Sequence, residues 1–398
     1  MNVAIVGGGI AGLALALNLH TRGIACRVFE AAPALRELGV GITLLPHAMR
    51  ELTALGLQEQ LLAAGIENRE SAFFNRFGQL IYKEPRGRHA GYDVPEVGIH
   101  RGRLHMLLLA AVRARLGHDS VVEDRRFLGL EQHEQGAILY LEQTTTGERV
   151  APVHADVVVA CDGVNSAVRK LFYPDEGLAF TGINTWRGVT RRKPILDGRT
   201  YLRIGSIRTG KIVVYPIADA IDAEGRQLIN WTTEIQRDGA AQNDWNRPGR
   251  LADFHHLYAD WRFDWLDVAA LISEADAIFE YPMVDKDPIE RWTFDRVTLA
   301  GDAAHPMYPR GSNGSAQALI DVRTLADLLA REGDPRAALK AYEAARAGPT
   351  ANVVRTNREN PPDAINMKVE ELTGDRPFVD LDRYISQAEL KALSDGYK

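Results

Sequence analysis

The sequence is poor in cysteine. Its 398 residues contain two, Cys26 and Cys161, and their spacing matches no metal-ligand or redox motif. This scarcity argues against a disulfide scaffold, a cysteine zinc site and a thiol redox pair.

Long apolar runs and an excess of positive charge are also lacking. The longest apolar stretch, around Leu104 to Val112, is about half of the roughly 20 residues that span a bilayer. The N-terminus has no basic leader segment. With 47 Lys and Arg against 53 Asp and Glu, the net charge is −6, which argues against nucleic-acid binding through bulk charge. We expect a cytoplasmic protein with neither a nucleic-acid nor a membrane partner.

The composition is otherwise that of an ordinary globular protein. Hydrophobic residues make up 45% of the chain and charged residues 25%. A chain of this length can bury a large core across roughly two domains.

The first thirty residues contain a strand, a glycine-rich turn, a helix and a second strand. Residues 2–6 read as a buried strand, the helix continues to about Arg22, and the strand 26–29 ends at Glu30. The turn holds Gly7, Gly9 and Gly12 in the spacing GxGxxG. This order of elements predicts an adenine dinucleotide site.

Each residue type in that motif has a physical role. Gly7 permits the tight turn, Gly9 leaves room for a pyrophosphate, and Gly12 lets the helix pack closely on the strand. The helix N-terminus attracts phosphate. The Glu30 carboxylate can accept hydrogen bonds from ribose hydroxyls.

Two later segments also deliver an acidic residue at the end of a strand. Residues 155–169 read as a strand that reaches Asp162 and then a helix capped by Ser166. Residues 296–306 read as a strand that reaches Gly301 and Asp302. Open α/β sheets bind ligands at such strand ends.

These three motifs, in this order, resemble the class A FAD-dependent aromatic monooxygenases of the para-hydroxybenzoate hydroxylase type. The resemblance implies an α/β fold in which a Rossmann-like FAD-binding domain carries an inserted antiparallel β-sheet substrate domain. It implies domains at 1–70, 100–176 and 284–350 for FAD, and at 71–99 and 177–283 for substrate. Residues 351–398 would form a C-terminal helical tail.

Carried over residue by residue, the resemblance places FAD at the motif residues and at the glycine and arginine between them. The cofactor-binding residues it implies are Gly7, Gly9, Ala11, Gly12, Glu30, Gly41, Arg101, Asp162, Arg169, Gly301, Asp302, Pro309, Gly314 and Ser315.

The loop after the third motif departs from the family pattern P-x-x-G-Q-G-x-N. Ser312, Asn313 and Ala316 replace the usual Gly, Gln and Asn. This variant, together with the segments EPRG, IHRG, WRGVT and YPMVD, is similar to the phenazine hydroxylase branch, the type of 5-methylphenazine-1-carboxylate 1-monooxygenase. The stretch from Thr356 to Lys398 does not resemble that enzyme, so the same substrate does not follow.

Three residues are candidates for contact with a substrate, and each has a structural alternative. Arg187 could bind a carboxylate or form a structural ion pair. His305 could act as a base or hydrogen-bond its own loop. Tyr215 could line a pocket or pack in the core. No residue pattern indicates a metal site.

The resemblance implies a monooxygenase that uses NADH or NADPH as a transient co-substrate, with O₂, to hydroxylate a small, carboxylated aromatic or heteroaromatic substrate, with or without decarboxylation. Oxygen transfer would pass through a flavin C4a-hydroperoxide. Two alternatives stay open: an FAD-dependent reductase without oxygen insertion, and a non-catalytic flavin-binding protein. We expect a monomer or a homodimer.

Overall fold

The predicted glycine-rich unit forms the centre of the first half of the molecule. The computed structural model describes residues 1–236, 248–359 and 364–396. In it, β1 (Asn2–Val6) leads into α1 (Ile10–Thr21), and β2 (Ala25–Phe29) follows. Both strands are paired in parallel, from Asn2 with Ala25 to Val6 with Phe29.

Strand β1 lies inside a sheet that, in the described ranges, has the order β20-β21-β12-β1-β2-β8. All neighbours are parallel except β20 and β21. Most residues of helix α1 are apolar and buried. This composition suits its position between the sheet and helices α4 and α7. The added elements are β8 (Val121–Val122), β12 (Val157–Ala160), β20 (Thr293–Phe294), β21 (Val297–Leu299), α4 (Arg101–Leu116) and α7 (Asn313–Arg331).

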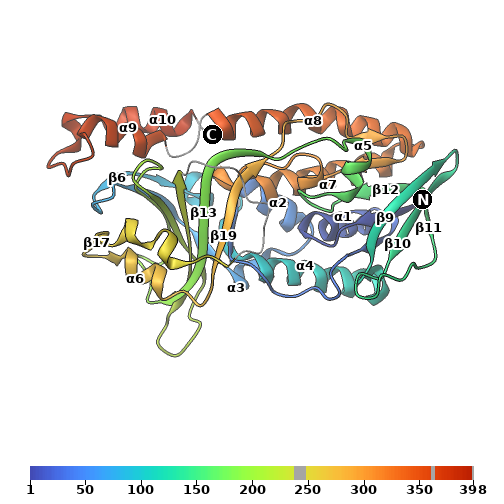
Figure 1. Cartoon of the computed structure of the whole chain (residues 1–398), viewed down its shortest axis with the longest axis horizontal. Helices are drawn as coiled ribbons and strands as arrows, with labels where there is room; N and C mark the ends of the chain where they lie inside the picture. The colour runs from blue at the N-terminus through green and yellow to red at the C-terminus, as the bar shows by residue number, and fades with distance from the viewer. Residues whose placement is uncertain (237–247, 360–363, 397–398) are drawn as a thin grey trace.

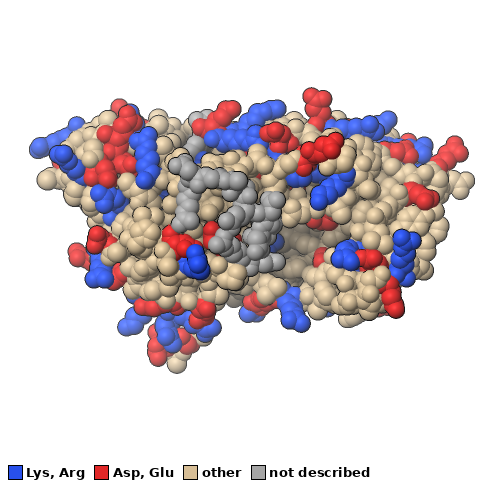
Figure 2. All heavy atoms as spheres, viewed as in Figure 1, with Lys and Arg blue, Asp and Glu red and all other residues tan. Residues whose placement is uncertain are grey.

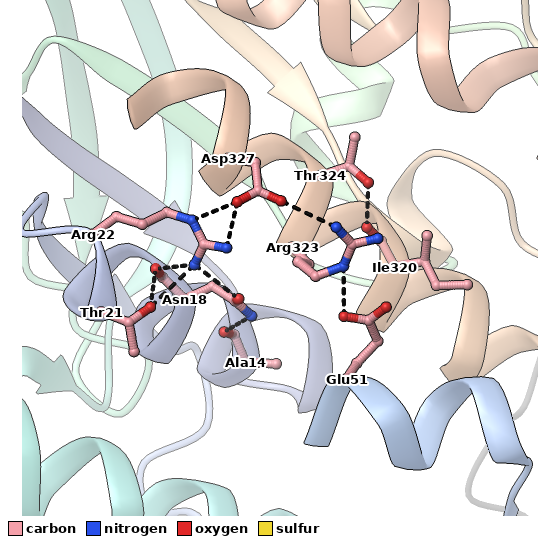
Figure 3. A network of polar contacts seen from close by, with 9 residues as sticks. All are labelled: Ala14, Asn18, Thr21, Arg22, Glu51, Ile320, Arg323, Thr324 and Asp327. Atoms are coloured by element: carbon pink, nitrogen blue, oxygen red, sulfur yellow. Dashed lines mark hydrogen bonds and ion pairs between the residues drawn. The ribbon is translucent and has the colours of Figure 1, made fainter. Parts of the chain in front are cut away.

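A polar network at the surface joins helices α1 and α7 to a third helix, α2 (Pro46–Ala54) (Figure 3). Arg22, just after α1, donates to the Asp327 carboxylate of α7, which also accepts from Arg323. Arg323 in turn forms a 2.7 Å ion pair with Glu51 of α2. Three helices that are distant in sequence are therefore held together by side chains that remain partly exposed.

The second half of the molecule is built on a larger sheet, in which the described strands have the order β19-β13-β16-β15-β14-β5-β6. Its pairs are antiparallel except β14 with β5. The long strands β13 and β19 stand at the junction of the two halves (Figure 1). The strands are β5 (Glu70–Phe74), β6 (Leu80–Pro85), β13 (Ala179–Arg192), β14 (Thr200–Ile204), β15 (Lys211–Ala218), β16 (Gln227–Gln236) and β19 (Ile278–Asp285).

The two faces of this sheet differ in character. On one face, Trp186 and Trp231 pack with Phe254 and with helix α6 (Val268–Ser273) in an aromatic core. The opposite face carries Arg187, Tyr215 and Asn230, because successive side chains of a strand alternate between faces. This second face meets the strands β3 (Gly41–Leu44), β4 (Ile66–Asn68) and β7 (Glu96–His100).

The remaining elements surround these sheets. Strands β9 (Arg126–His133), β10 (Gly136–Glu142) and β11 (Val153–Ala155) form an antiparallel sheet at the far end of the first half (Figure 1). Helices α3 (Gln58–Ala64) and α5 (Ala167–Phe172) and the short strand pair β17 (Arg262–Phe263) and β18 (Leu266–Asp267) lie outside these sheets. Together these observations confirm the predicted fold class.

The C-terminal helices run along both halves of the molecule (Figure 1). Helix α8 (Pro335–Glu359) passes through residue 350 and so crosses the expected start of the tail at residue 351. It tolerates Pro349 because the following turns bury Thr350, Val354 and Asn357. Helices α9 (Ala364–Thr373) and α10 (Gln387–Asp395) then follow, and Ser386 caps α10.

Helices α9 and α10 cover one edge of the larger sheet. Ile365, Val369 and Leu390 form a core with Phe73 and Tyr82. Polar contacts flank this core, among them Ser394 with Glu84 and the amide of Asn366 with the Phe74 carbonyl at 2.8 Å. The tail is thus packed against the second half of the molecule.

The visible surface mixes charges of both signs (Figure 2). Lys and Arg side chains alternate with Asp and Glu over both halves, with no field of one sign on this face. Among the helices of residues 1–236, 248–359 and 364–396, none combines the length and the apolar character that crossing a bilayer requires.

The packing of the tail makes a stability prediction. Replacing Leu390 with Ala removes a fully buried side chain and should lower the free energy of unfolding by about 2–5 kcal/mol. Leu393→Ala is the matched control, because Leu393 is 37% exposed, and should change stability by about 0.5 kcal/mol or less. Chemical denaturation followed by tryptophan fluorescence measures the free energy of unfolding of both variants. A loss in Leu390→Ala as small as the one expected for Leu393→Ala would contradict the predicted contribution of the tail packing.

Candidate active site

The glycine turn between β1 and α1 is required by close contacts. Gly7 has a φ of 103°, and a Cβ built on it would lie 2.5 Å from the carbonyl oxygen of Cys161. A Cβ on Gly12 would lie 2.0 Å from the carbonyl oxygen of Gly7. A Cβ on Gly9 would meet no protein atom within 4 Å. Close packing therefore requires glycine at positions 7 and 12. Gly9 instead leaves an open space in front of the helix N-terminus.

Glu30 lies beside this turn, as the sequence predicts. Its carboxylate accepts from the amide of Gly8 at 2.6 Å and from the amide of Ala32 at 2.7 Å. His105, on α4, places its Nε2 2.6 Å from the Gly8 carbonyl oxygen. The turn is therefore held by a carboxylate that directly follows β2 and by an imidazole on α4.

The three predicted motifs meet at the carboxyl ends of β1, β12 and β21. A Cβ on Gly7 would lie 2.9 Å from the Cα of Asp162, and one on Gly301 would lie 3.3 Å from the Cβ of Ala11. The Asp162 carboxylate accepts from Val168 through one oxygen, while the other is buried without a hydrogen-bond partner in the described residues. Burial raises the pKa of Asp162.

Arg169 connects the second motif to the third. Its buried guanidinium donates to the carbonyl oxygens of Ala303 and Ala304 at 3.0 and 2.7 Å. Its other donors bind the carboxylate of Glu176, which also pairs with Lys286. These contacts engage the arginine with protein atoms and fix the loop that follows Asp302.

His305 belongs to a buried polar cluster centred on Asp321. Both residues are almost fully buried, and His305 Nε2 is hydrogen-bonded to Asp321. The same carboxylate accepts from the Gly301 amide at 3.1 Å and from Arg346 Nε at 2.7 Å. Asp321 therefore holds the third motif against helices α7 and α8. His305 Nδ1 is buried with no hydrogen-bond partner in the described part of the chain.

The loop that departs from the family pattern lies at the start of α7. Ser312, which replaces a glycine, has a φ of 59° in the left-handed region that favours glycine. A Cβ built on Gly314 would lie 3.9 Å from Asp302 Oδ1. The loop from Pro309 to Ser315 therefore reaches the third motif through its backbone, and the serine adopts the glycine conformation at a cost of about 1–2 kcal/mol.

Gly41 brings the larger sheet close to the first half of the molecule. Its amide donates to Asn230 Oδ1 at 2.7 Å, and a Cβ on Gly41 would lie 2.6 Å from the Asn230 side chain. Arg101 begins α4 nearby and its amide donates to the Val40 carbonyl oxygen at 2.8 Å. The glycine is required because the asparagine fills the space of a side chain.

Arg187 and Tyr215 lie on the same face of the larger sheet as Asn230, the face that contacts Gly41. The Arg187 guanidinium stands over the Tyr281 ring at 5.5 Å, and its Nε is buried without a hydrogen-bond partner among the described residues. Burial lowers the pKa of Arg187. Tyr215 is buried and stacks on Tyr201 with ring centroids 4.9 Å apart, and burial raises its pKa.

These features fit a dinucleotide cofactor. The space before Gly9 lies at the N-terminus of a twelve-residue helix whose first turn contains no acidic side chain. Such a terminus attracts phosphate groups. The partnerless oxygen of Asp162 and the exposed carboxylate of Asp302 stand near it as acceptors for hydroxyl groups. Open space, helix dipole and acceptors together suit a pyrophosphate flanked by sugar hydroxyls.

Comparison with known proteins agrees with this geometry. The family model of the FAD binding domain matches residues 1–199 and 279–357. The chain belongs to the FAD-binding domain family. It is 42% identical over 363 residues to the phenazine 1,6-dicarboxylic acid hydroxylase PhzS of Lysobacter antibioticus, covering 90% of this chain and 89% of the relative. It is 32% identical to the 3-amino-4-hydroxybenzoate 2-monooxygenase of Streptomyces cremeus, covering 90% and 86%.

Solved structures show the same fold. HpxO of Klebsiella pneumoniae, in complex with FAD and uric acid, superposes with a TM-score of 0.79 at 22% identity, covering 100% of this chain and 96% of that one. A salicylate hydroxylase substrate complex superposes with a TM-score of 0.73, also at 22% identity, covering 99% and 93%. This flavoprotein is a monooxygenase whose cofactor is FAD, as the motifs predict.

Sequence reasoning missed several residues that shape the site of this flavoprotein. His105 follows Arg101 by one helical turn, and that spacing could have indicated a shared face. Asn230 stands between the apolar Ile229 and Trp231, a strand alternation that marks the opposite face. Arg346 gave no local signal, because only packing of α8 on α7 brings it to Asp321.

The glycine contacts separate a folding requirement from a binding requirement. Gly12→Ala should destabilise the protein strongly, because its Cβ would collide with the Gly7 carbonyl. Gly9→Ala should fold with an unchanged thermal midpoint after FAD removal, yet bind FAD at least about tenfold more weakly because the new methyl group enters the phosphate space. Calorimetry of apoprotein with FAD measures both effects; normal FAD affinity in Gly9→Ala would contradict this placement.

The Asp321 cluster predicts a pH dependence of stability. Burial raises the pKa of Asp321, but His305 and Arg346 outweigh it and hold this pKa below its ordinary value. Such a carboxyl stabilises the fold above about pH 4 and loses that contribution as the pH falls through its folded pKa. Asp321→Asn should lower stability at pH 7 by about 3 kcal/mol.

The deficit of Asp321→Asn relative to wild type should stay constant from about pH 8 to 5 and shrink below about pH 4. Urea unfolding at stepped pH measures it. Asp119→Asn is the control, because that side chain is fully exposed. A deficit that does not change on acidification would show that Asp321 stabilises the fold by packing alone.

Proposed function

We propose that this flavoprotein hydroxylates a carboxylated aromatic or heteroaromatic compound, with NADH or NADPH and O₂ as co-substrates. One observation carries the proposal. Arg187 is a largely buried cation whose Nε lacks a hydrogen-bond partner and whose guanidinium has no carboxylate partner in the described residues. A desolvated guanidinium is costly without an anion, and its fork matches a carboxylate. The names of the relatives above, which act on carboxylated aromatics, support the same class.

The residues around the cofactor have separate roles in this proposal. FAD, when bound, supplies hydride acceptance and oxygen activation. Arg187 orients the substrate, Tyr215 and Tyr281 line its apolar space, and the contact of Gly41 with Asn230 closes the sheet against the cofactor half and helps to exclude water. We assign His305 a positioning role, since its bond to Asp321 fixes the third motif.

The expected domain limits belong to the same proposal, with substrate bound by 71–99 and 177–283. Since the sequence contains one dinucleotide fingerprint, NADH or NADPH binds transiently. The enzyme acts in the cytoplasm as a monomer or homodimer without nucleic acid.

Purified holoenzyme tests the function directly. Oxidation of NADH and NADPH is followed while phenazine, phenolic, pyridine and indole carboxylates are added under ¹⁸O₂. We expect one carboxylate to accelerate oxidation and to gain one ¹⁸O atom. Stimulated oxidation that yields only H₂O₂ for every compound would instead support a reductase without oxygen insertion. Absence of any stimulation would support the non-catalytic alternative.

Arg187 gives a sharper test of carboxylate binding. Arg187→Gln should raise the KM for the carboxylated substrate by about 10-fold to 100-fold, the range of one charged hydrogen bond. Arg187→Lys should recover part of the loss, because it keeps the charge but not the fork. The control Arg191→Gln lies on the same strand with its side chain 60% exposed and should change nothing. An unchanged KM in Arg187→Gln would overturn this role.

A further inference from the structure

A cavity lies on the side of the six-stranded sheet that faces away from helix α1. Cys26 on β2 reaches the carbonyl oxygen of Ala16 in α1 at 3.9 Å. Because side chains alternate along a strand, Arg27 and Phe29 project from the opposite face. The strands β10 and β11, at the end of the molecule that carries the N-terminus (Figure 1), lie against this face. Between the two sheets is a cavity of about 390 Å³.

The floor of this cavity is apolar. Ala4, Phe29 and Leu141, which come from β1, β2 and β10, line it and are at most 3% exposed. Val150 and Val153 add apolar surface nearer the opening. The volume falls in the range of about 300–1,000 Å³ that small-molecule sites occupy. The cavity is therefore large enough for a ring compound and offers its rings an apolar, partly aromatic surface.

Three basic side chains line the same cavity. They are Arg27, Arg125 and His154, whereas no acidic residue of the described chain lines it. Neither arginine forms an ion pair with a described residue. Arg27 stands over an aromatic ring of the floor at 5.4 Å, and Arg125 donates to the Asp124 carbonyl oxygen at 2.9 Å. The Asp124 carboxylate accepts from Thr145 instead. Both guanidinium groups therefore keep donors for an anion.

The cavity is separate from the cofactor and substrate positions. None of the glycines of the first motif lines it, and neither does Arg187. It ends beside the support of the glycine turn, because the amide of Arg125 donates to the Glu30 carbonyl oxygen at 2.7 Å. We propose that this cavity is a second ligand site and that it binds an aromatic anion with one acidic group. The rings pack on Phe29, and the acidic group binds Arg27 and Arg125.

Three ligands with the same ring system test the proposal. The anions 2-naphthoate and 2-naphthyl phosphate and the neutral 2-naphthamide are titrated into the holoenzyme by calorimetry. We expect at least one anion to bind about tenfold more tightly than the amide, and the tighter anion identifies the acidic group. Failure of both anions to bind, or equal binding of anions and amide, would overturn the proposal.

Variants of the cavity locate the bound anion. Arg27→Gln and Arg125→Gln should each weaken its binding by about 3-fold to 10-fold, a modest loss because solvent reaches both guanidinium groups. Val150→Trp should fill the cavity from its opening and abolish binding. The control is Arg149→Gln, because Arg149 is exposed and does not line the cavity. Unchanged binding in both arginine variants would refute the site even if Val150→Trp does not fold.

The same titrations in Arg187→Gln separate this site from the substrate site. Binding that persists in Arg187→Gln but weakens in Arg27→Gln supports the cavity. Binding that Arg187→Gln removes and Arg27→Gln leaves unchanged would place the anion at the proposed substrate site and overturn this inference. Neither result depends on turnover, so ¹⁸O incorporation tests the hydroxylase function independently.

Discussion

The buried carboxylate of Asp321 is the interaction on which the cofactor half depends. It joins the amide of Gly301 and the imidazole of His305, from one loop, to the guanidinium of Arg346 on α8. A buried carboxylate with charged partners is strongly destabilised when a partner is lost, so the cluster behaves as a unit. Through Arg169, which binds the loop after Asp302, the same rigidity extends to the second motif.

The larger sheet makes the opposite use of buried charge. Its aromatic face forms an ordinary core around Trp186 and Trp231 and stabilises the domain. Its other face carries Arg187, whose Nε has no hydrogen-bond partner in the described residues, a cost in stability that an enzyme tolerates where it prepares a site for an anion. The sheet thereby separates a stabilising surface from a binding surface by strand alternation alone.

The altered loop before α7 illustrates how a backbone site survives substitution. Ser312 takes the left-handed conformation in which the family places glycine, so the chain keeps its course to Gly314 and the third motif. Contacts made by backbone amides depend on this course and not on the side chains. The replacement of Asn by Ala316, which is fully buried, removes a polar side chain from the helix and leaves the helix intact.

The sequence by itself determined the first βα unit and the three strand-end motifs, because these depend on local periodicity and on glycine at fixed spacing. It also identified Arg187 but could not choose between its two roles. Only the tertiary structure decided that Asn230 fills the space beside Gly41 and that the C-terminal helices pack on β5 and β6. Register and docking are set by contacts between segments far apart in the chain, and no local pattern encodes them.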